Sequence, residues 1–184
     1  MDGIGSQVKE PVSAMLTGPY GHPFHPLLVT VPIGAWVSSL VFDIGSHVAD
    51  ERAALALGAR WLIAIGVLGA VAAATVGFLD FSTIPSGTPV HRTAVLHMAL
   101  NLVITGLFAV DFVWRLGAGG TATDAGPLVL SALGLACLGV SGSLGGKLAY
   151  RYGVRVAAET AQADGFVTRG AHSGGTPTKT DKTS

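Results

Sequence analysis

Residues 21–45 read GHPFHPLLVTVPIGAWVSSLVFDIG, and this stretch decides the fold. From Leu27 onward it is an apolar run about as long as the roughly 20 residues that a helix needs to cross a bilayer. Pro26 suits the first position of such a helix, because the nitrogen there needs no partner within the helix. Pro32 lies inside the run, leaves the carbonyl of Leu28 without its helical donor and predicts a kink. The stretch therefore predicts a membrane-spanning helix.

Three further apolar stretches of similar length follow. They run from Trp61 to about Leu79, from about Thr93 to Trp114 and from Leu128 to about Leu148. In the first of these, Gly69, Ala73 and Gly77 recur every fourth residue and form a strip where another helix can approach closely. Gly142 and Gly146 repeat this spacing in the last stretch. The sequence predicts an all-α integral membrane protein, an antiparallel four-helix bundle.

Composition excludes several classes of protein. Of the 184 residues, 49% are hydrophobic and 12% are charged, and the mean hydropathy is +0.56. A soluble domain carries about twice that share of charge, so lipid is the expected surroundings. The 11 basic and 11 acidic residues cancel without a dense basic cluster, which argues against a nucleic-acid partner. The single Cys137 excludes a disulfide, a four-thiolate zinc site and a cysteine-ligated iron–sulfur cluster within one chain.

We expect three segments along the chain: a head over residues 1–20, the four-helix transmembrane domain over 21–157 and a flexible polar tail over 158–184. The head lacks the features of a secretory signal and is expected to stay attached. The tail, with disorder expected from Gln162 to Ser184, has too few apolar side chains to offset the entropy of ordering. No self-similar period of roughly 20 to 50 residues stands out.

The basic residues that flank the apolar stretches predict the orientation. Those on the side of the termini are Lys9, Arg92, Lys147, Arg151 and Arg155, and those on the other side are Arg52, Arg60 and Arg115. Cytoplasmic flanks carry the excess of Lys and Arg. The N- and C-termini are therefore expected in the cytoplasm.

Polar residues collect at one end of the predicted bundle. Alternate threading brings the starts of the first and third helices and the ends of the second and fourth to one membrane face. The residues gathered there are His22, His25, Asp80, His91, Arg92, His97, Lys147, Tyr150 and Arg151. Of the five histidines outside the tail, only His47 belongs to the opposite face. We expect a shared polar site at or just inside the cytoplasmic interface.

The segment from His22 to Pro26 presents two imidazoles three residues apart on a backbone restricted by prolines, which suits a ligand site. An equally supported interpretation is that both histidines cap a helix at the interface. On the third stretch His97 and Asn101 lie one helical turn apart, and ionisable groups inside a membrane helix often mark ligand sites or pathways. The alternative there is a hydrogen-bonded seam between helices.

Asp80 ends the second apolar stretch. Cations expected at the same end are Arg92, Lys147 and Arg151. The carboxylate can pair with one of them, or it can bind the second nitrogen of a ligating histidine and fix its tautomer.

A second charged group is expected at the opposite end. It consists of Asp43, Arg60, Asp111 and Arg115. The spacing of four between Asp111 and Arg115 suits an ion pair, and we interpret this end as structural.

Together these motifs resemble a family of small bacterial four-helix membrane proteins, domain of unknown function 2231. They are GHPFHPLLVTVPIGAW at 21–36 with Asp43, GFLDF at 77–81, the stretch from His91 and Arg92 to His97 and Asn101, and GGKLAYRYGVRV at 145–156. The resemblance covers about Gly21 to Ala157. It implies the four-helix fold and the bacterial inner membrane. Some relatives are joined to Rieske-type iron–sulfur or cytochrome c-like domains, which implies redox partners.

The first functional hypothesis is a membrane protein associated with electron transfer. In it His25 and His97, with His22 or His91 as alternates, ligate a b-type haem or a transition-metal ion. His97 lies only about one turn, roughly 5 Å, inside the apolar run, so a haem would be shallow. A smaller metal ion, bound by His22, His25, His97 and Asp80, fits that geometry better than a haem.

Two other hypotheses stay open. The second is a non-catalytic anchor or scaffold subunit whose polar end docks a cytoplasmic partner and whose Gly-rich helices allow self-association. The third is a proton or ion pathway along the stripe of His97, Asn101, Thr105 and Asp111. It ranks last because no helix is clearly broken at mid-membrane. No signature of a catalytic site is present.

Overall fold

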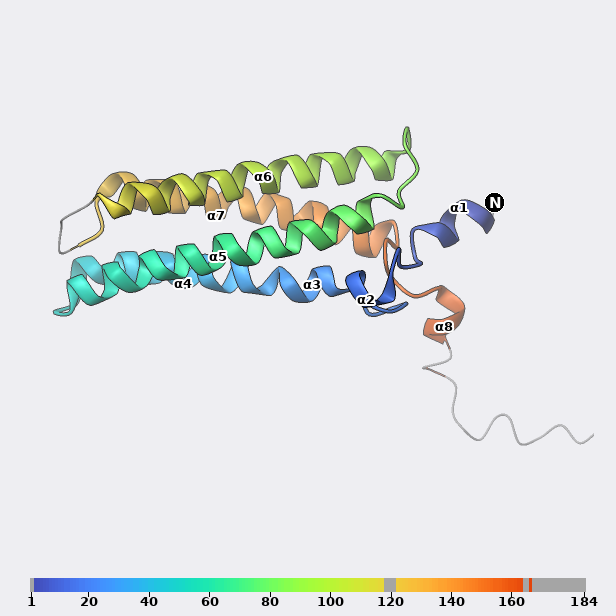
Figure 1. Cartoon of the computed structure of the whole chain (residues 1–184), viewed down its shortest axis with the longest axis horizontal. Coiled ribbons are helices and arrows are strands. Elements are labelled where there is room, and N and C mark those ends of the chain that lie inside the picture. The colour runs from blue at the N-terminus through green and yellow to red at the C-terminus, as the bar shows by residue number, and fades with distance from the viewer. Residues whose placement is uncertain (1, 118–121, 164–165, 167–184) are drawn as a thin grey trace, which may run out of the picture.

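The computed structural model describes residues 2–117, 122–163 and 166, and throughout this part every regular element is helical. Four long helices run side by side (Figure 1). The elements are α1 (Asp2–Gln7), α2 (Ala14–Thr17), α3 (Phe24–Leu28), α4 (Thr30–Val48), α5 (Arg52–Phe81), α6 (Pro89–Leu116), α7 (Ala125–Gly146), a π-helix (Lys147–Arg151) and α8 (Glu159–Ala163). The predicted all-α four-helix bundle is confirmed.

Four helical segments are long and apolar enough to cross a membrane. They are Phe24–Val48, Arg52–Phe81, Pro89–Leu116 and Ala125–Arg151. Their outer faces carry large exposed apolar side chains such as Leu68, Val41 and Val113, as expected for surfaces that contact lipid. The protein is a multi-pass membrane protein.

The first span begins earlier than the sequence predicts. Pro23, with extended backbone, precedes the first residue of α3, Phe24, and Pro26 is the third residue of the helix. The expectation of Pro26 at the first position is wrong, but its physical basis holds, since nitrogens throughout the first turn lack helical partners. The regular helix is interrupted at Val29, three residues before Pro32, and the kink itself stays a prediction.

The bundle consists of two helical hairpins. In the first, α3 and α4 pack on α5, and in the second, α6 packs on α7; the hairpins meet where α5 faces α6 and α4 faces α7. At the centre the rings of Trp36 and Phe108 stack with centroids 4.1 Å apart. Ile63 and Ile104, both fully buried, complete this central apolar layer.

Glycines allow the close approach within each hairpin. A Cβ at Gly69 would lie 2.7 Å from Cγ1 of Val31, so the predicted small-residue strip on α5 does face a neighbouring helix. The prediction for Gly142 and Gly146 is wrong, since a Cβ at either would meet nothing within 4 Å. On α7 the glycine against the core is Gly134, where a Cβ would lie 2.7 Å from Cε2 of Phe108.

At the end of the bundle where both described chain ends lie, Arg155 joins three segments. Its backbone has φ 59°, and its N–H donates to the carbonyl of Val8 (2.8 Å). Its guanidinium donates to the carbonyls of Thr17 (3.0 Å) and Gly18 (2.8 Å), and its Nε lies 2.9 Å from Oδ1 of Asp80. We call this arrangement the Arg155 clasp. It holds the N-terminal segment against the end of the bundle (Figure 1).

The expected disordered tail falls almost entirely outside the described residues, which end with 163 and 166.

Candidate functional site

His25 lies in the first turn of α3 and turns toward α5. Its Nδ1–H donates to the carbonyl of Ala73 at 2.9 Å. The ring fits there because the adjacent residue on α5 is Gly77, where a Cβ would lie 2.8 Å from Nδ1. Because a carbonyl oxygen only accepts, this bond assigns the proton of the neutral ring to Nδ1 and its lone pair to Nε2.

His97 makes the same kind of contact in the second hairpin. Its Nδ1–H donates to the carbonyl of Ser141 at 3.0 Å, and the Ser141 hydroxyl lies 3.1 Å away. Asn101 uses both amide hydrogens, one on the Ser141 hydroxyl (2.6 Å) and one on the carbonyl of His97 (2.8 Å). The same amide nitrogen also lies 3.3 Å from Nε2 of His97, so a ligand at Nε2 would displace this contact. Gly145 faces the ring, with a Cβ there 3.2 Å from Cε1.

The two imidazoles meet across the bundle. Their ring centroids lie 6.4 Å apart and their planes are nearly perpendicular, at 83°. This contact joins α3 to α6, two helices that otherwise share no packing. A backbone carbonyl on each Nδ1 is the arrangement that orients metal-ligating histidines and raises their basicity. Whether the pair binds a ligand stays a prediction.

The two hairpins share one pattern of residue spacings, at an offset too long to register as a period of roughly 20 to 50 residues. His25 precedes Trp36 by the same eleven residues that separate His97 from Phe108. On the second helices, the sets with equal internal spacing are Gly66, Ala73 and Gly77 in α5 and Gly134, Ser141 and Gly145 in α7. Each set packs against the ring residues of its own hairpin. His25 and His97 therefore occupy equivalent places in the two hairpins.

The other residues expected at this end lie apart from the pair. His22 is exposed and bonds the carbonyl of Tyr20 at 3.3 Å. Asp80 is buried and pairs with Arg155, a partner that the sequence analysis did not consider. His91 packs against the ring of Phe81, with centroids 5.1 Å apart.

Three more of the expected residues, Arg92, Tyr150 and Arg151, are exposed at this end. Within residues 2–117, 122–163 and 166, no three His, Cys, Asp or Glu side chains are grouped to hold a metal ion. The fold thus brings two potential metal ligands, His25 and His97, into edge-to-face contact.

The opposite end holds a buried ionic network. Arg115 makes a bidentate contact with Asp43 (2.6 and 2.9 Å) and contacts Asp111 (3.0 and 3.1 Å). The hydroxyls of Ser131 and Thr123 donate to Asp111 and Asp43, both at 2.8 Å. The predicted pair of Asp111 and Arg115 is confirmed. The network ties α4, α6 and α7 together, and every charge in it has a partner.

The central apolar layer separates the histidine pair from this network. Trp36, Phe108, Ile63 and Ile104 fill the interior between the two polar ends and are at most 1% exposed. The stripe of His97, Asn101 and Asp111 on α6 is thus interrupted by apolar side chains. Thr105, half-buried beside Ile104, is the member of the predicted stripe that lies at this level.

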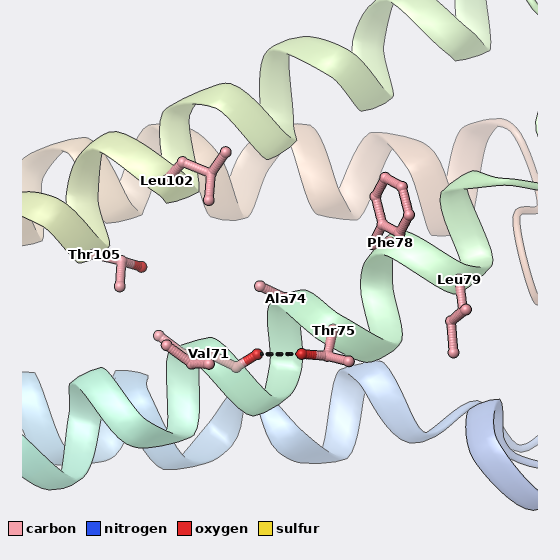
Figure 2. A pocket seen from close by; sticks show the side chains of 8 residues that line it. Val71, Ala74, Thr75, Phe78, Leu79, Leu102 and Thr105 are labelled. Atoms are coloured by element: carbon pink, nitrogen blue, oxygen red, sulfur yellow. Dashed lines mark hydrogen bonds between the residues drawn. The ribbon is translucent and has the colours of Figure 1, made fainter.

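A groove of about 430 Å³ opens between α5 and α6. It is lined by Ala70, Val71, Ala74, Thr75, Phe78, Leu79, Leu102 and Thr105 (Figure 2). The hydroxyl of Thr75 donates to the carbonyl of Val71 and is not free for a ligand (Figure 2). The groove shares its stretch of α5 with Ala73 and Gly77, which contact His25.

Comparison with known proteins agrees with the membrane assignment. A family model described as "Predicted membrane protein (DUF2231)" matches residues 21–158. No curated protein and no solved structure matches the chain. The matched residues include all four spans and both histidines.

Proposed function

The chain belongs to the DUF2231 family of predicted membrane proteins, and on that premise we propose that His25 and His97 together bind a metal centre within the bilayer. One observation carries the proposal: the two rings meet edge to face with centroids 6.4 Å apart, and each Nδ1 is held by a carbonyl of its own hairpin. With the proton of each neutral ring on Nδ1, Nε2 is the nitrogen that can bind a metal, and at His97 the metal would replace the contact with the Asn101 amide. Transition-metal ions and haem iron both take imidazole ligands.

Electron transfer is the activity that we propose for this centre. It lies among apolar helices without a polar route across the membrane, so it suits the passage of electrons better than that of ions. The proposed partner is a Rieske-type iron–sulfur protein or a cytochrome. We place the protein in the bacterial inner membrane with both termini and the histidine end toward the cytoplasm, because of the five-to-three excess of basic residues on that side.

Metal and haem analysis of the full chain tests this function. The protein is purified gently in detergent and its Fe, Cu, Zn and haem contents are measured per chain, together with its absorbance spectrum. We expect about one metal per chain in the wild type and a loss of at least about tenfold in His25→Ala and His97→Ala. His22→Ala serves as the matched control, since that imidazole lies outside the pair. A wild-type protein without metal or haem, also after addition of either, overturns the function.

A non-catalytic anchor is the second candidate. The observation that favours it is the exposed set of Arg92, Tyr150 and Arg151 at the end of the bundle, where Tyr150 is 91% exposed. Such a surface suits a docked partner or a second copy of the chain. An anchor keeps its co-purifying partners in the His25→Ala/His97→Ala double variant and loses them in Tyr150→Ala/Arg151→Ala. If the protein instead holds a metal centre, bound metal is lost in the His25→Ala/His97→Ala double variant and kept in Tyr150→Ala/Arg151→Ala.

A further inference from the structure

Resting on the proposed metal centre at His25 and His97, we propose that its ligand is a haem. The macrocycle lies in the seam between the hairpin of α3, α4 and α5 and the hairpin of α6 and α7. One edge of the macrocycle reaches the groove between α5 and α6.

The number of protein donors favours a macrocycle. A bare Zn²⁺ or similar ion in a protein needs three or four side-chain ligands. The described residues offer no third His, Cys, Asp or Glu beside the pair. Haem iron receives four nitrogens from its own ring and needs only the two axial positions filled, for which imidazole is a common ligand.

The spacing of the rings fits two axial ligands of one iron. An imidazole nitrogen lies about 2 Å from a bound metal, and the ring centroid lies about 1 Å behind that nitrogen, so two axial imidazoles have centroids roughly 6 Å apart. The observed separation is 6.4 Å. The two donors come from different hairpins at matching places in the sequence, as ligands on the two faces of a macrocycle do.

The surroundings fit a flat, apolar ligand. The groove between α5 and α6 has about 430 Å³, which is within the range of ligand pockets, and its lining is apolar apart from Thr75 and Thr105. Ala74 and Phe78 line the groove (Figure 2). They directly follow Ala73 and Gly77, which contact His25, so the groove lies at the same height along α5 as that contact.

The pair lies some way along the helices that hold it. Helix α6 begins at Pro89, so His97 lies eight residues into it, or roughly 12 Å at 1.5 Å per residue. His25 contacts Ala73, which lies at a similar distance from the end of α5 at Phe81. A haem held here lies about two helical turns inside the ends of α5 and α6.

The first experiment loads the full chain with haem. The protein is produced with added haem precursor, purified in detergent, and analysed for haem per chain and for the absorbance of six-coordinate low-spin iron. We expect about one haem per chain, and at least about a tenfold loss in His25→Ala and in His97→Ala, partly restored by added imidazole. His91→Ala, at the same end of the bundle, is expected to keep its haem.

The second experiment tests the groove. Ala74→Trp fills it, whereas Ala72→Trp adds the same ring to an exposed position of α5 outside the groove. We expect about a tenfold loss of haem in the first variant and wild-type content in the second. Circular dichroism and gel filtration establish that both variants are folded. Unchanged haem in folded Ala74→Trp overturns the placement of the macrocycle.

The outcomes separate this inference from the function on which it rests. If the protein binds Zn²⁺, Co²⁺ or Cu²⁺ stoichiometrically through both histidines but binds no haem, the haem proposal is wrong. The proposed metal centre is then still supported. A protein that binds neither metal nor haem overturns both proposals. If haem stays bound in the His25→Ala/His97→Ala double variant, the assignment of these two histidines as axial ligands is wrong.

Discussion

Gly77 and Gly142 are both small residues of membrane-spanning helices, but only Gly77 has a neighbour against it. The His25 ring occupies the space that a side chain at Gly77 would take, and a Cβ at Gly142 would meet nothing within 4 Å. Replacing Gly77 by Ala forces the imidazole away from the Ala73 carbonyl. We expect overpacking to cost about 1–3 kcal/mol of unfolding free energy and to weaken ligand binding at His25.

Thermal unfolding in detergent and haem or metal content check this prediction, with Gly142→Ala as the matched control. Equal behaviour of the two variants contradicts the close contact between His25 and α5.

Arg115 is the one cation between two buried carboxylates, so its removal is expected to be more damaging than the removal of an ordinary surface arginine. Arg115→Met leaves Asp43 and Asp111 facing each other without a counter-charge. Breaking a buried ion pair costs about 3–5 kcal/mol. We expect a loss of at least this size in unfolding free energy, measured by denaturation in detergent.

The control for Arg115→Met is Arg60→Met. Arg60 is a basic residue near the same end, and the sequence predicts it in this network. A similar, small change in both variants is the result that speaks against a network centred on Arg115.

At the scale of the helices, the sequence predicts the four spans but not where they begin and end. Helix α5 begins at Arg52, nine residues before the predicted Trp61, and α6 begins at Pro89 rather than near Thr93. The reason is physical: a helix continues into the interface, where water and headgroups accept charged side chains, while an apolar window ends there. Capping determines the real start of α6, where the Thr88 hydroxyl accepts from the N–H of His91 at 3.1 Å.

Packing between elements gives a prediction of its own. Trp36 is 1% exposed, stacks on Phe108 and donates from Nε1 to the carbonyl of Ile63 at 3.3 Å. Trp36→Ala opens a cavity between α4, α5 and α6, and we expect a loss of about 3–5 kcal/mol. Trp61 is 59% exposed, so Trp61→Ala is the matched control with a small effect. Denaturation curves of both variants measure the difference, and comparable losses would contradict a core centred on Trp36.

At the scale of the whole molecule, the Arg155 clasp joins the start of the chain, the end of α5 and the segment after the π-helix. Arg155→Gly keeps the left-handed backbone without strain but deletes the guanidinium. We expect cleavage near residues 9–18 to become faster. The cleavage rate rises at least about tenfold if the lost contacts contribute 1.4 kcal/mol or more to the stability of the docked segment. The control is Arg151→Gly, which removes an exposed guanidinium nearby. Equal cleavage of both variants would show that the clasp does not hold the N-terminal segment.

The candidate site was only partly predictable from the sequence. Alternate threading correctly brings His25 and His97 to one end, because that result depends only on the number and direction of spans. The Ala73 and Ser141 carbonyls could not be found, since a backbone acceptor leaves no trace in residue type. Arg155 was missed as the partner of Asp80 because it lies beyond the last span, on a backbone turn that only the structure reveals.

The repeated spacing also places unlike charges opposite each other. Asp43 follows His25 by the same eighteen residues as Arg115 follows His97, so the two partners of the bidentate ion pair occupy matching places in the two hairpins. In an assembly of two identical hairpins both places would carry the same side chain, and like charges would meet in a low-dielectric interior. The attraction at this end therefore needs two hairpins of different sequence, which a single chain provides.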